Sequence, residues 1–161
     1  MTEPVTNVVI AGLGGQGVLK ASDVLADAAF TAGLDVKKSE IHGMSQRGGS
    51  VTSDVRFGSR VFSPMVPTGE IDFLVVLAEG QADLHRSGLR PGGVLIPCDA
   101  VDPASLSDRR SLNVALLGVL SRHLEIDEAA WQEAIRRNLK AHLHEANLRA
   151  FAIGRAAACV S

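Results

Sequence analysis

The segment Asn7–Gly17, NVVIAGLGGQG, is a short apolar run that breaks into glycines at positions 12, 14, 15 and 17. This pattern is typical of a buried strand that passes through a tight turn into a helix. Glycines 12, 14 and 17 fit the dinucleotide fingerprint, in which one makes the turn, one lets backbone approach a phosphate and one packs helix against strand. A helix beginning near Gln16 would direct its free N–H groups and its positive dipole end at a ligand above the turn.

The fingerprint leaves the ligand open. The same glycines also suit close packing in an α/β domain that binds nothing. No GK[ST] follows them, so the turn is not a P-loop. A classical NAD site needs a carboxylate about 20 positions further on, at the end of the second strand. Asp35 and Glu40 bracket that distance, and Glu40 is the better candidate, although it could instead cap the loop that follows.

Length and composition indicate the class of protein. We expect the 161 residues to form one domain, 1–161, and 46% hydrophobic with 21% charged residues is ordinary for a soluble protein. A formal net charge of −2 and 4% aromatic residues argue against a nucleic-acid partner. The chain has no apolar run of membrane-spanning length, and its polar start, MTEPVT, does not read as a signal peptide. We therefore expect a cytoplasmic protein without a membrane partner.

Helical and strand periodicities alternate along the first two thirds of the chain. They predict a first helix that runs to about Ala32 with Gly33 as C-cap, and a helical connection at Leu84–Leu89. Strands are predicted at Asp35–Ser39, Phe73–Leu77 and Val94–Ile96, and a β-hairpin is predicted from Val51–Phe57 and Arg60–Phe62 around Gly58-Ser59. The C-terminal part is predicted to be helical, with helices at Asn113–Leu124, after Asp127 as N-cap, and from about His142 to Ala158. The fold class that follows is α/β. It is a Rossmann-like three-layer domain with a mixed, mainly parallel sheet, a β-hairpin and a helical C-terminal tail.

A second segment, Glu40–Ser50 with the sequence EIHGMSQRGGS, combines a titratable ring, a fixed cation and exposed backbone donors. These are the parts of an anion or carbonyl recognition site. The residues concerned are His42, Gln46, Arg47, Gly48, Gly49 and Ser50. The alternative is a polar surface loop in which Arg47 makes only a structural salt bridge.

Metal ligands and catalytic groups are not evident in the sequence. Cys98 and Cys159 are far apart and unaccompanied, so this chain alone should build no iron–sulfur or zinc cluster. His142 and His144 are two positions apart and would not share one face of a helix, as a metal-binding pair must. We expect no metal site and no catalytic residue in this chain.

Three segments together carry a family resemblance. Gly12–Gly17 (GLGGQG), Ser39–Ser50 (SEIHGMSQRGGS) and Asn147–Phe151 (NLRAF) closely resemble the gamma subunit, or gamma domain, of the thiamine-dependent 2-oxoacid:ferredoxin oxidoreductases. The resemblance is strongest to the small (beta) subunit of indolepyruvate ferredoxin oxidoreductase, and it runs from about Val5 to Arg155. The GGQG turn and the RGG segment at this separation are more specific together than either is alone.

The resemblance implies a non-autonomous oxidoreductase subunit. Such a subunit supports the oxidative decarboxylation of a 2-oxoacid, here of the indolepyruvate or arylpyruvate type, to an acyl-CoA. Thiamine pyrophosphate, Mg and iron–sulfur clusters would lie in a large partner subunit, and ferredoxin would be reached through the complex. In isolation the chain could form a homo-oligomer, because the surface meant for a partner would be exposed.

The resemblance also suggests site residues, position by position. Coenzyme A (CoA) is the implied co-substrate, and its phosphate-binding turn would be lined by Gly12, Leu13, Gly14, Gly15, Gln16 and Gly17. The Arg47–Ser50 segment would face CoA or the partner. Two other classes stay open: a free-standing nucleotide- or NAD-binding Rossmann protein, and a purely structural subunit that keeps the glycines for packing.

Overall fold

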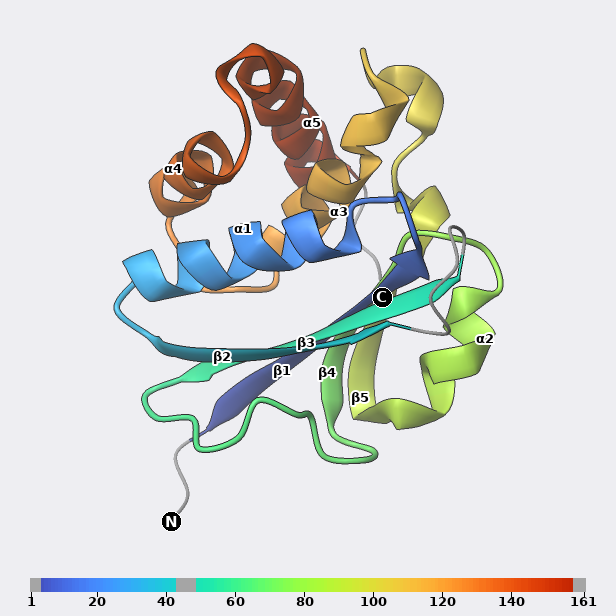
Figure 1. Ribbon diagram of the computed structural model, residues 1–161, viewed down its shortest axis with the longest axis vertical. Coiled ribbons are helices and arrows are strands. Elements are labelled where there is room, and N and C mark those ends of the chain that lie inside the picture. The colour runs from blue at the N-terminus through green and yellow to red at the C-terminus, as the bar shows by residue number, and fades with distance from the viewer. Residues whose placement is uncertain (1–3, 43–48, 158–161) are drawn as a thin grey trace.

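The computed structural model describes residues 4–42 and 49–157, and within them five strands form one mixed sheet in the order β2-β3-β1-β4-β5 (Figure 1). The strands are β1 (Val5–Leu13), β2 (Asp35–His42), β3 (Ser50–Gly58), β4 (Ile71–Val76) and β5 (Leu89–Ile96). Strand β1 pairs in parallel with β4, and β4 with β5, whereas β3 is antiparallel to both β1 and β2. Of these strands only β3 therefore runs in the opposite direction, which confirms the predicted mixed, mainly parallel sheet.

Helices cover both faces of the sheet, but unequally (Figure 1). The α-helices are α1 (Val18–Thr31), α2 (Gln81–His85), α3 (Leu112–Ser121), α4 (Glu128–Asn138) and α5 (His144–Ala156), and short 3-10 turns lie at Arg86–Gly88, Cys98–Ala100, Pro103–Ser105, Arg109–Ser111 and Ala141–Leu143. Helices α1 and α3 lie next to the sheet, with α4 and α5 farther out, while α2 lies on the opposite face. The three-layer α/β fold is thus confirmed.

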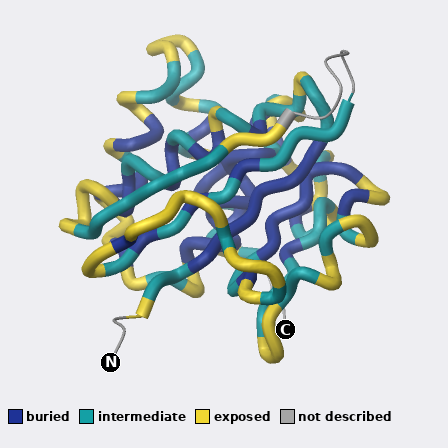
Figure 2. The backbone as a smooth tube through the Cα atoms, turned by 60° about the horizontal axis from the view of Figure 1, so that its bottom comes forward, coloured by how far each residue is buried: buried dark blue, intermediate teal, exposed yellow. Residues whose placement is uncertain are grey.

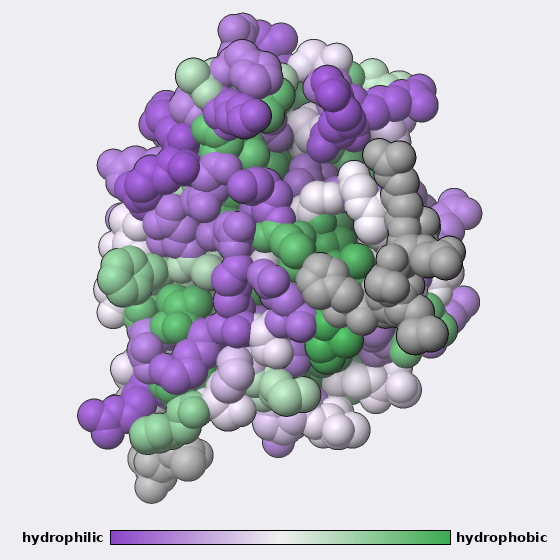
Figure 3. Space-filling model, in the orientation of Figure 1, coloured by the Kyte–Doolittle hydropathy of each residue, from purple (hydrophilic) through white to green (hydrophobic). Residues whose placement is uncertain are grey.

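The main hydrophobic core lies between the sheet and the larger helical layer. Every residue of α3 from Asn113 to Ser121 is buried, as expected for a helix enclosed on all sides. Trp131 of α4 and Phe151 of α5 are fully buried and lie with ring centroids 5.5 Å apart. In Figure 3 hydrophilic side chains dominate over α4 and α5, so the outer side of this layer faces solvent. The predicted helical C-terminal region is confirmed, and its first helix is part of the core.

The predicted hairpin at Arg60–Phe62 is wrong. Strand β3 is flanked by β1 and β2 along its whole length, so it has no free edge for a returning strand. The chain after Gly58 instead crosses the face of the sheet opposite α1, where side chains satisfy its backbone. Asp35 Oδ2 accepts a hydrogen bond from Val61 N at 2.8 Å, and Arg56 Nη1 donates to Ser63 O at 2.8 Å.

The other predicted elements differ mainly at their ends. Helix α1 begins at Val18, with Gly17 as N-cap, and Gly33 follows its end with φ +90°, as a C-cap glycine should. Asp127 is the N-cap of α4. In the β4–β5 ladder, Ile71 pairs with Leu89 and Phe73 with Val94, so residues 90–93 of β5 bulge out directly before the predicted strand Val94–Ile96. Ala158, the expected end of the last helix, lies outside the described residues.

Among the helices within residues 4–42 and 49–157, none combines the length and the apolar character that a membrane span requires.

Candidate functional site

The sheet topology defines a crevice at the carboxyl ends of β1 and β4. From β1 the chain passes through α1 to β2 on one side, while β4 and β5 lie on the other side, and ligands of open α/β sheets bind at such a switch point. The glycine turn follows β1 at this edge, and Leu77 follows β4. The two segments are joined by a hydrogen bond from Leu77 N to Ala11 O of 2.8 Å.

Gln16 has a structural role in the turn. Leu13 N donates to Gln16 Oε1 at 2.7 Å, and Gln16 Nε2 donates to Leu77 O at 3.3 Å, so this side chain ties the end of β1 to the end of β4. Gly12 lies beneath it with no room for a side chain. A Cβ there would be 2.9 Å from Val18 Cγ2 and 3.0 Å from Leu77 Cβ. Both residues therefore shape the turn by packing and hydrogen bonding.

Gly15 and Gly17 have different surroundings, although both adopt positive φ, +91° and +80°. A Cβ on Gly17 would lie 2.5 Å from Asn113 Nδ2, the atom that donates to Gly17 O at 3.0 Å. A Cβ on Gly15 would meet nothing within 4 Å, because this residue is exposed at the rim of the crevice. Gly17 is thus required for packing against α3, whereas Gly15 borders open space.

The space beside Gly15 forms a cavity of about 330 Å³. Its lining residues are Gly15, Gln16, Gly17, Leu77, Arg109, Arg110, Leu112 and Asn113. The N-terminus of α1 lies at this cavity. Its N-cap is a glycine, so no side chain caps the first-turn N–H groups. These groups and the helix dipole make the cavity favourable for an anion.

Two arginines from the 3-10 turn before α3 add positive charge to the cavity. Arg110 is already paired with Asp108 through Nε to Oδ1 at 3.2 Å and Nη2 to Oδ2 at 3.0 Å, and these side-chain hydrogen bonds hold the pKa of Asp108 below its usual value. Arg109 is exposed, and its side chain makes no hydrogen bond or ion pair with any described residue. Arg109 is therefore the cation of this cavity that a ligand can use. It is not among the site residues predicted from the sequence.

The second predicted segment joins the glycine turn at one end. Gly14 N donates to Gly49 O at 2.8 Å, and Leu13 pairs with Ser50 in the β1–β3 ladder. Gln81 Nε2 of α2 also donates to Ser50 Oγ at 3.3 Å. His42 is the last residue of β2, where it pairs with Val51. The other three residues of the prediction, Gln46, Arg47 and Gly48, lie outside the described residues.

Neither carboxylate considered for a ribose lies beside the turn. Both are on β2, which β3 separates from β1. Glu40 Oε1 accepts from Lys38 Nζ at 3.0 Å, and Asp35 Oδ2 accepts from Val61 N at 2.8 Å. Each therefore has a structural partner at the far edge of the sheet.

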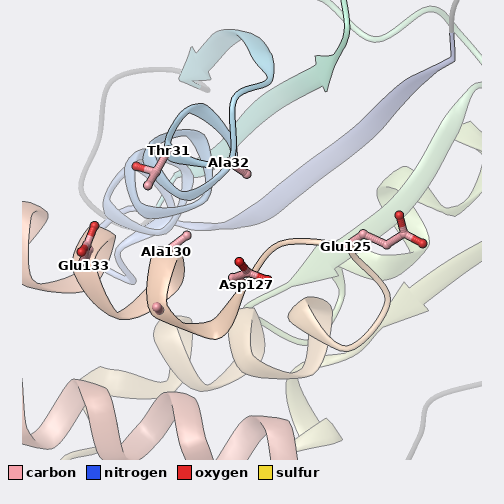
Figure 4. A pocket seen from close by; sticks show the side chains of 7 residues that line it. Thr31, Ala32, Glu125, Asp127, Ala130 and Glu133 are labelled. Atoms are coloured by element: carbon pink, nitrogen blue, oxygen red, sulfur yellow. The ribbon is translucent and has the colours of Figure 1, made fainter.

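A second cavity of about 330 Å³ lies between the end of α1 and the start of α4, and it has the opposite character. Its polar lining includes Glu125, Asp127 and Glu133, and it contains no Lys or Arg. Figure 4 shows these carboxylates spread apart rather than converging on one point. In the part of the chain that the structure describes, no group of three or more His, Cys, Asp or Glu side chains could hold a metal ion. The cavity at the glycine turn is therefore the better site for a phosphate.

Comparison with known proteins defines the family. A model of the pyruvate ferredoxin/flavodoxin oxidoreductase family matches residues 7–157, so the chain belongs to that family. It is 45% identical over 89 residues to the indolepyruvate oxidoreductase subunit IorB of Thermococcus kodakarensis. That alignment covers 55% of this chain and 44% of the relative, so the chain matches less than half of the relative's length.

Solved structures share the fold. The gamma subunit of a keto/oxoacid ferredoxin oxidoreductase from Geobacter sulfurreducens superposes with a TM-score of 0.78 at 23% identity, over 92% of this chain and 95% of that one. The 2-oxoglutarate:ferredoxin oxidoreductase of Magnetococcus marinus, solved with 2-oxoglutarate, coenzyme A and succinyl-CoA bound, gives a TM-score of 0.83 at 20% identity. The match covers 97% of this chain and 31% of that longer chain. The same fold thus occurs both as a separate chain and within a larger one.

Proposed function

We propose that this chain is the small, gamma-type subunit of a thiamine-dependent 2-oxoacid:ferredoxin oxidoreductase and that its glycine turn contributes to the CoA site. The observation that carries the CoA assignment is the cavity at the turn, where an uncapped helix N-terminus, the open backbone at Gly15 and the unpaired Arg109 meet. Family membership supports the reaction class. The name of the Thermococcus kodakarensis relative supports an indolepyruvate or other arylpyruvate substrate.

The proposed reaction converts a 2-oxoacid, CoA and two equivalents of a one-electron ferredoxin in its oxidised form to an acyl-CoA, carbon dioxide, a proton and two equivalents of reduced ferredoxin. Thiamine pyrophosphate with Mg supplies the electron sink and iron–sulfur clusters carry single electrons, and we assign both to a large partner subunit. This chain supplies no catalytic residue in the proposal. Its contribution is to hold a phosphate of CoA at the N-terminus of α1 so that the thiol end can reach the partner's active site.

Each part of the cavity has a role in that binding. The first-turn N–H groups of α1 would donate to phosphate oxygens, and Arg109 would add a mobile cation. Leu77 and Leu112 form an apolar wall of the cavity, which suits the parts of CoA that carry no phosphate. We propose that the segment containing His42, Gln46, Arg47, Gly48, Gly49 and Ser50 faces CoA or the partner, because its end is hydrogen-bonded to the turn at Gly14.

A free-standing NAD enzyme is the second candidate, and the site supports it less well. The fingerprint glycines favour it, but the carboxylates that would hold a ribose lie on β2, beyond β3. A purely structural subunit is the third candidate, because the φ of +91° at Gly15 is by itself a reason for glycine in the turn, and a CoA titration that shows no binding would favour it.

Reconstitution with the large subunit tests the proposal through two adjacent arginines. Arg109→Ala should raise the KM for CoA by about tenfold or more, which corresponds to about 1.4 kcal/mol or more for a charged hydrogen bond, without changing the KM for the 2-oxoacid. Arg110→Ala is the matched control. It should change the KM for CoA by less than about threefold, because Arg110 is already paired with Asp108.

Two results would contradict this function. One is 2-oxoacid-dependent reduction of an acceptor by the purified chain without its partner. The other is binding of NAD, rather than CoA, in calorimetric titrations of the chain and of the complex.

A further inference from the structure

A groove of about 270 Å³ lies on the face of the sheet opposite α1. Its walls are the end of β2, β3, α2 and the loop 59–70, and among the residues that line it are Ile41, Thr52, Asp54, Val66, Leu84 and His85. We call it the α2 groove. Figure 2, which brings the lower side of Figure 1 forward, shows exposed chain crossing in front of buried strands on this side. The α2 groove shares no lining residue with the cavity at the glycine turn.

Exposed apolar side chains gather around the α2 groove. Ile41 and Leu84 line it and are 50% and 64% exposed. Phe62 and Met65, 83% and 55% exposed, belong to the loop 59–70 that forms one wall. Among the described residues, the other large exposed hydrophobic side chain is Phe30, at the end of α1 on the opposite face. A grouping of this kind marks an interaction surface rather than scattered surface residues.

The α2 groove also contains one carboxylate, Asp54, to which no Lys or Arg side chain of the described residues is hydrogen-bonded. Asp54 Oδ2 accepts from Val66 N at 2.9 Å, and its other oxygen has no hydrogen-bond partner among the described residues. The nearby Arg56 donates to Asn7 Oδ1 at 2.8 Å instead. Burial raises the pKa of Asp54 although the nearby charges of His85 and Arg56 act in the opposite direction, and burial lowers the pKa of His85 although Asp54 raises it, so the neighbouring charges compensate Asp54 only in part. A cation placed beside Asp54 would supply the missing partner.

We infer that the α2 groove is where the large partner subunit docks, through a segment that presents apolar side chains on both sides of a single Lys or Arg. This inference rests on the proposed function, which requires such a partner. The apolar rim fits the flanking side chains, and Asp54 fits the cation. A second copy that presents the same groove fits less well, because the groove lining contains no Lys or Arg to pair with Asp54.

The test measures the affinity of the full-length chain for the large subunit by calorimetry. Ile41→Ser, Leu84→Ser and Asp54→Asn should each weaken binding by about tenfold or more. Phe30→Ser is the matched control, since it removes an equally exposed apolar side chain from the opposite face, and it should change affinity by less than about twofold. Asp54→Asn keeps an oxygen that can accept the hydrogen bond from Val66 N, so this variant should fold. Its affinity for the large subunit therefore tests the docking inference even if a serine variant fails to fold.

The possible outcomes separate the α2 groove from the proposed function. Wild-type affinity in all folded groove variants would overturn the inference and leave the function intact. So would variants that lose self-association of the isolated chain but still bind the large subunit normally, because the groove would then be a homodimer surface. If the wild-type chain does not bind the large subunit at all, the proposed function fails together with the inference.

Discussion

Replacing Gly15 and Gly17 separately with alanine distinguishes the two uses of the glycine turn. Both residues have positive φ, +91° and +80°, so each alanine should destabilise the fold by about 1–2 kcal/mol through backbone strain. Any further difference between the two variants must come from what the added methyl group touches. The pair therefore contains its own control for strain.

The surroundings of the two residues give the expected magnitudes. At Gly17 the methyl carbon would lie 2.5 Å from Asn113 Nδ2, which is buried and donates to Gly17 O. Displacing this amide should add about 1–3 kcal/mol, so Gly17→Ala should lower the free energy of unfolding by about 2–5 kcal/mol in total. At Gly15 the methyl meets nothing within 4 Å, and only the strain remains.

Urea denaturation and CoA kinetics of the reconstituted complex are the two assays. Gly15→Ala should be the more stable variant, yet its KM for CoA should rise by about tenfold or more, because its methyl enters the space where backbone would approach a phosphate. Equal stability losses in the two variants would refute the steric argument at Gly17. An unchanged KM for CoA in folded Gly15→Ala would refute the ligand site and leave the glycines to packing.

Two further predictions concern the helical layer. Gly154→Ala should destabilise the fold by about 2–4 kcal/mol in urea titrations, because its Cβ would collide with the carbonyl of Ala115 across the α3–α5 contact, and a loss below about 1 kcal/mol would contradict this packing. Arg137→Gln should lower the free energy of unfolding at neutral pH, since Arg137 donates to Asp27 at 2.7 and 3.0 Å. Hydrogen bonds from Arg137 lower the pKa of Asp27 below 3.8. The stabilisation by Arg137 is therefore present above about pH 3.8 and is lost as the pH falls through the pKa of Asp27 in the folded state. A difference in the free energy of unfolding between variant and wild type that stays constant down to about pH 2 would contradict this.

The local parts of the fold could be predicted from the sequence because neighbouring residues determine them. The apolar run of β1, the glycines that follow it and the C-cap Gly33 act over a few positions, and the structure confirms them. Strand pairing is different. Gly58-Ser59 does mark the end of a strand, but whether a returning strand can pair there depends on the two neighbours of β3, which lie elsewhere in the sequence.

Arg109 shows why part of the candidate site could not be predicted. No motif around it indicates a ligand, and it reaches the turn only because α3 packs beside the N-terminus of α1. The contact that fixes this packing joins Asn113 to Gly17, 96 positions apart. By contrast, the sequence correctly predicted the turn itself and linked it with the Glu40–Ser50 segment through a resemblance. The hydrogen bond from Gly14 to Gly49 supplies the physical reason for that link.

The position of β3 explains how a dinucleotide-type turn can serve a different ligand. In the classical arrangement the second strand lies beside the first, and its terminal carboxylate reaches the ribose of a nucleotide bound at the turn. Here β3 pairs with β1 and places β2 one strand further away, about 10 Å from β1 at the usual strand spacing. The position beside Leu13 is occupied by Ser50. The chain thus keeps the glycines of the fingerprint but has the start of β3 where the ribose-binding carboxylate would be, and under the proposed function the turn would hold a phosphate without that carboxylate.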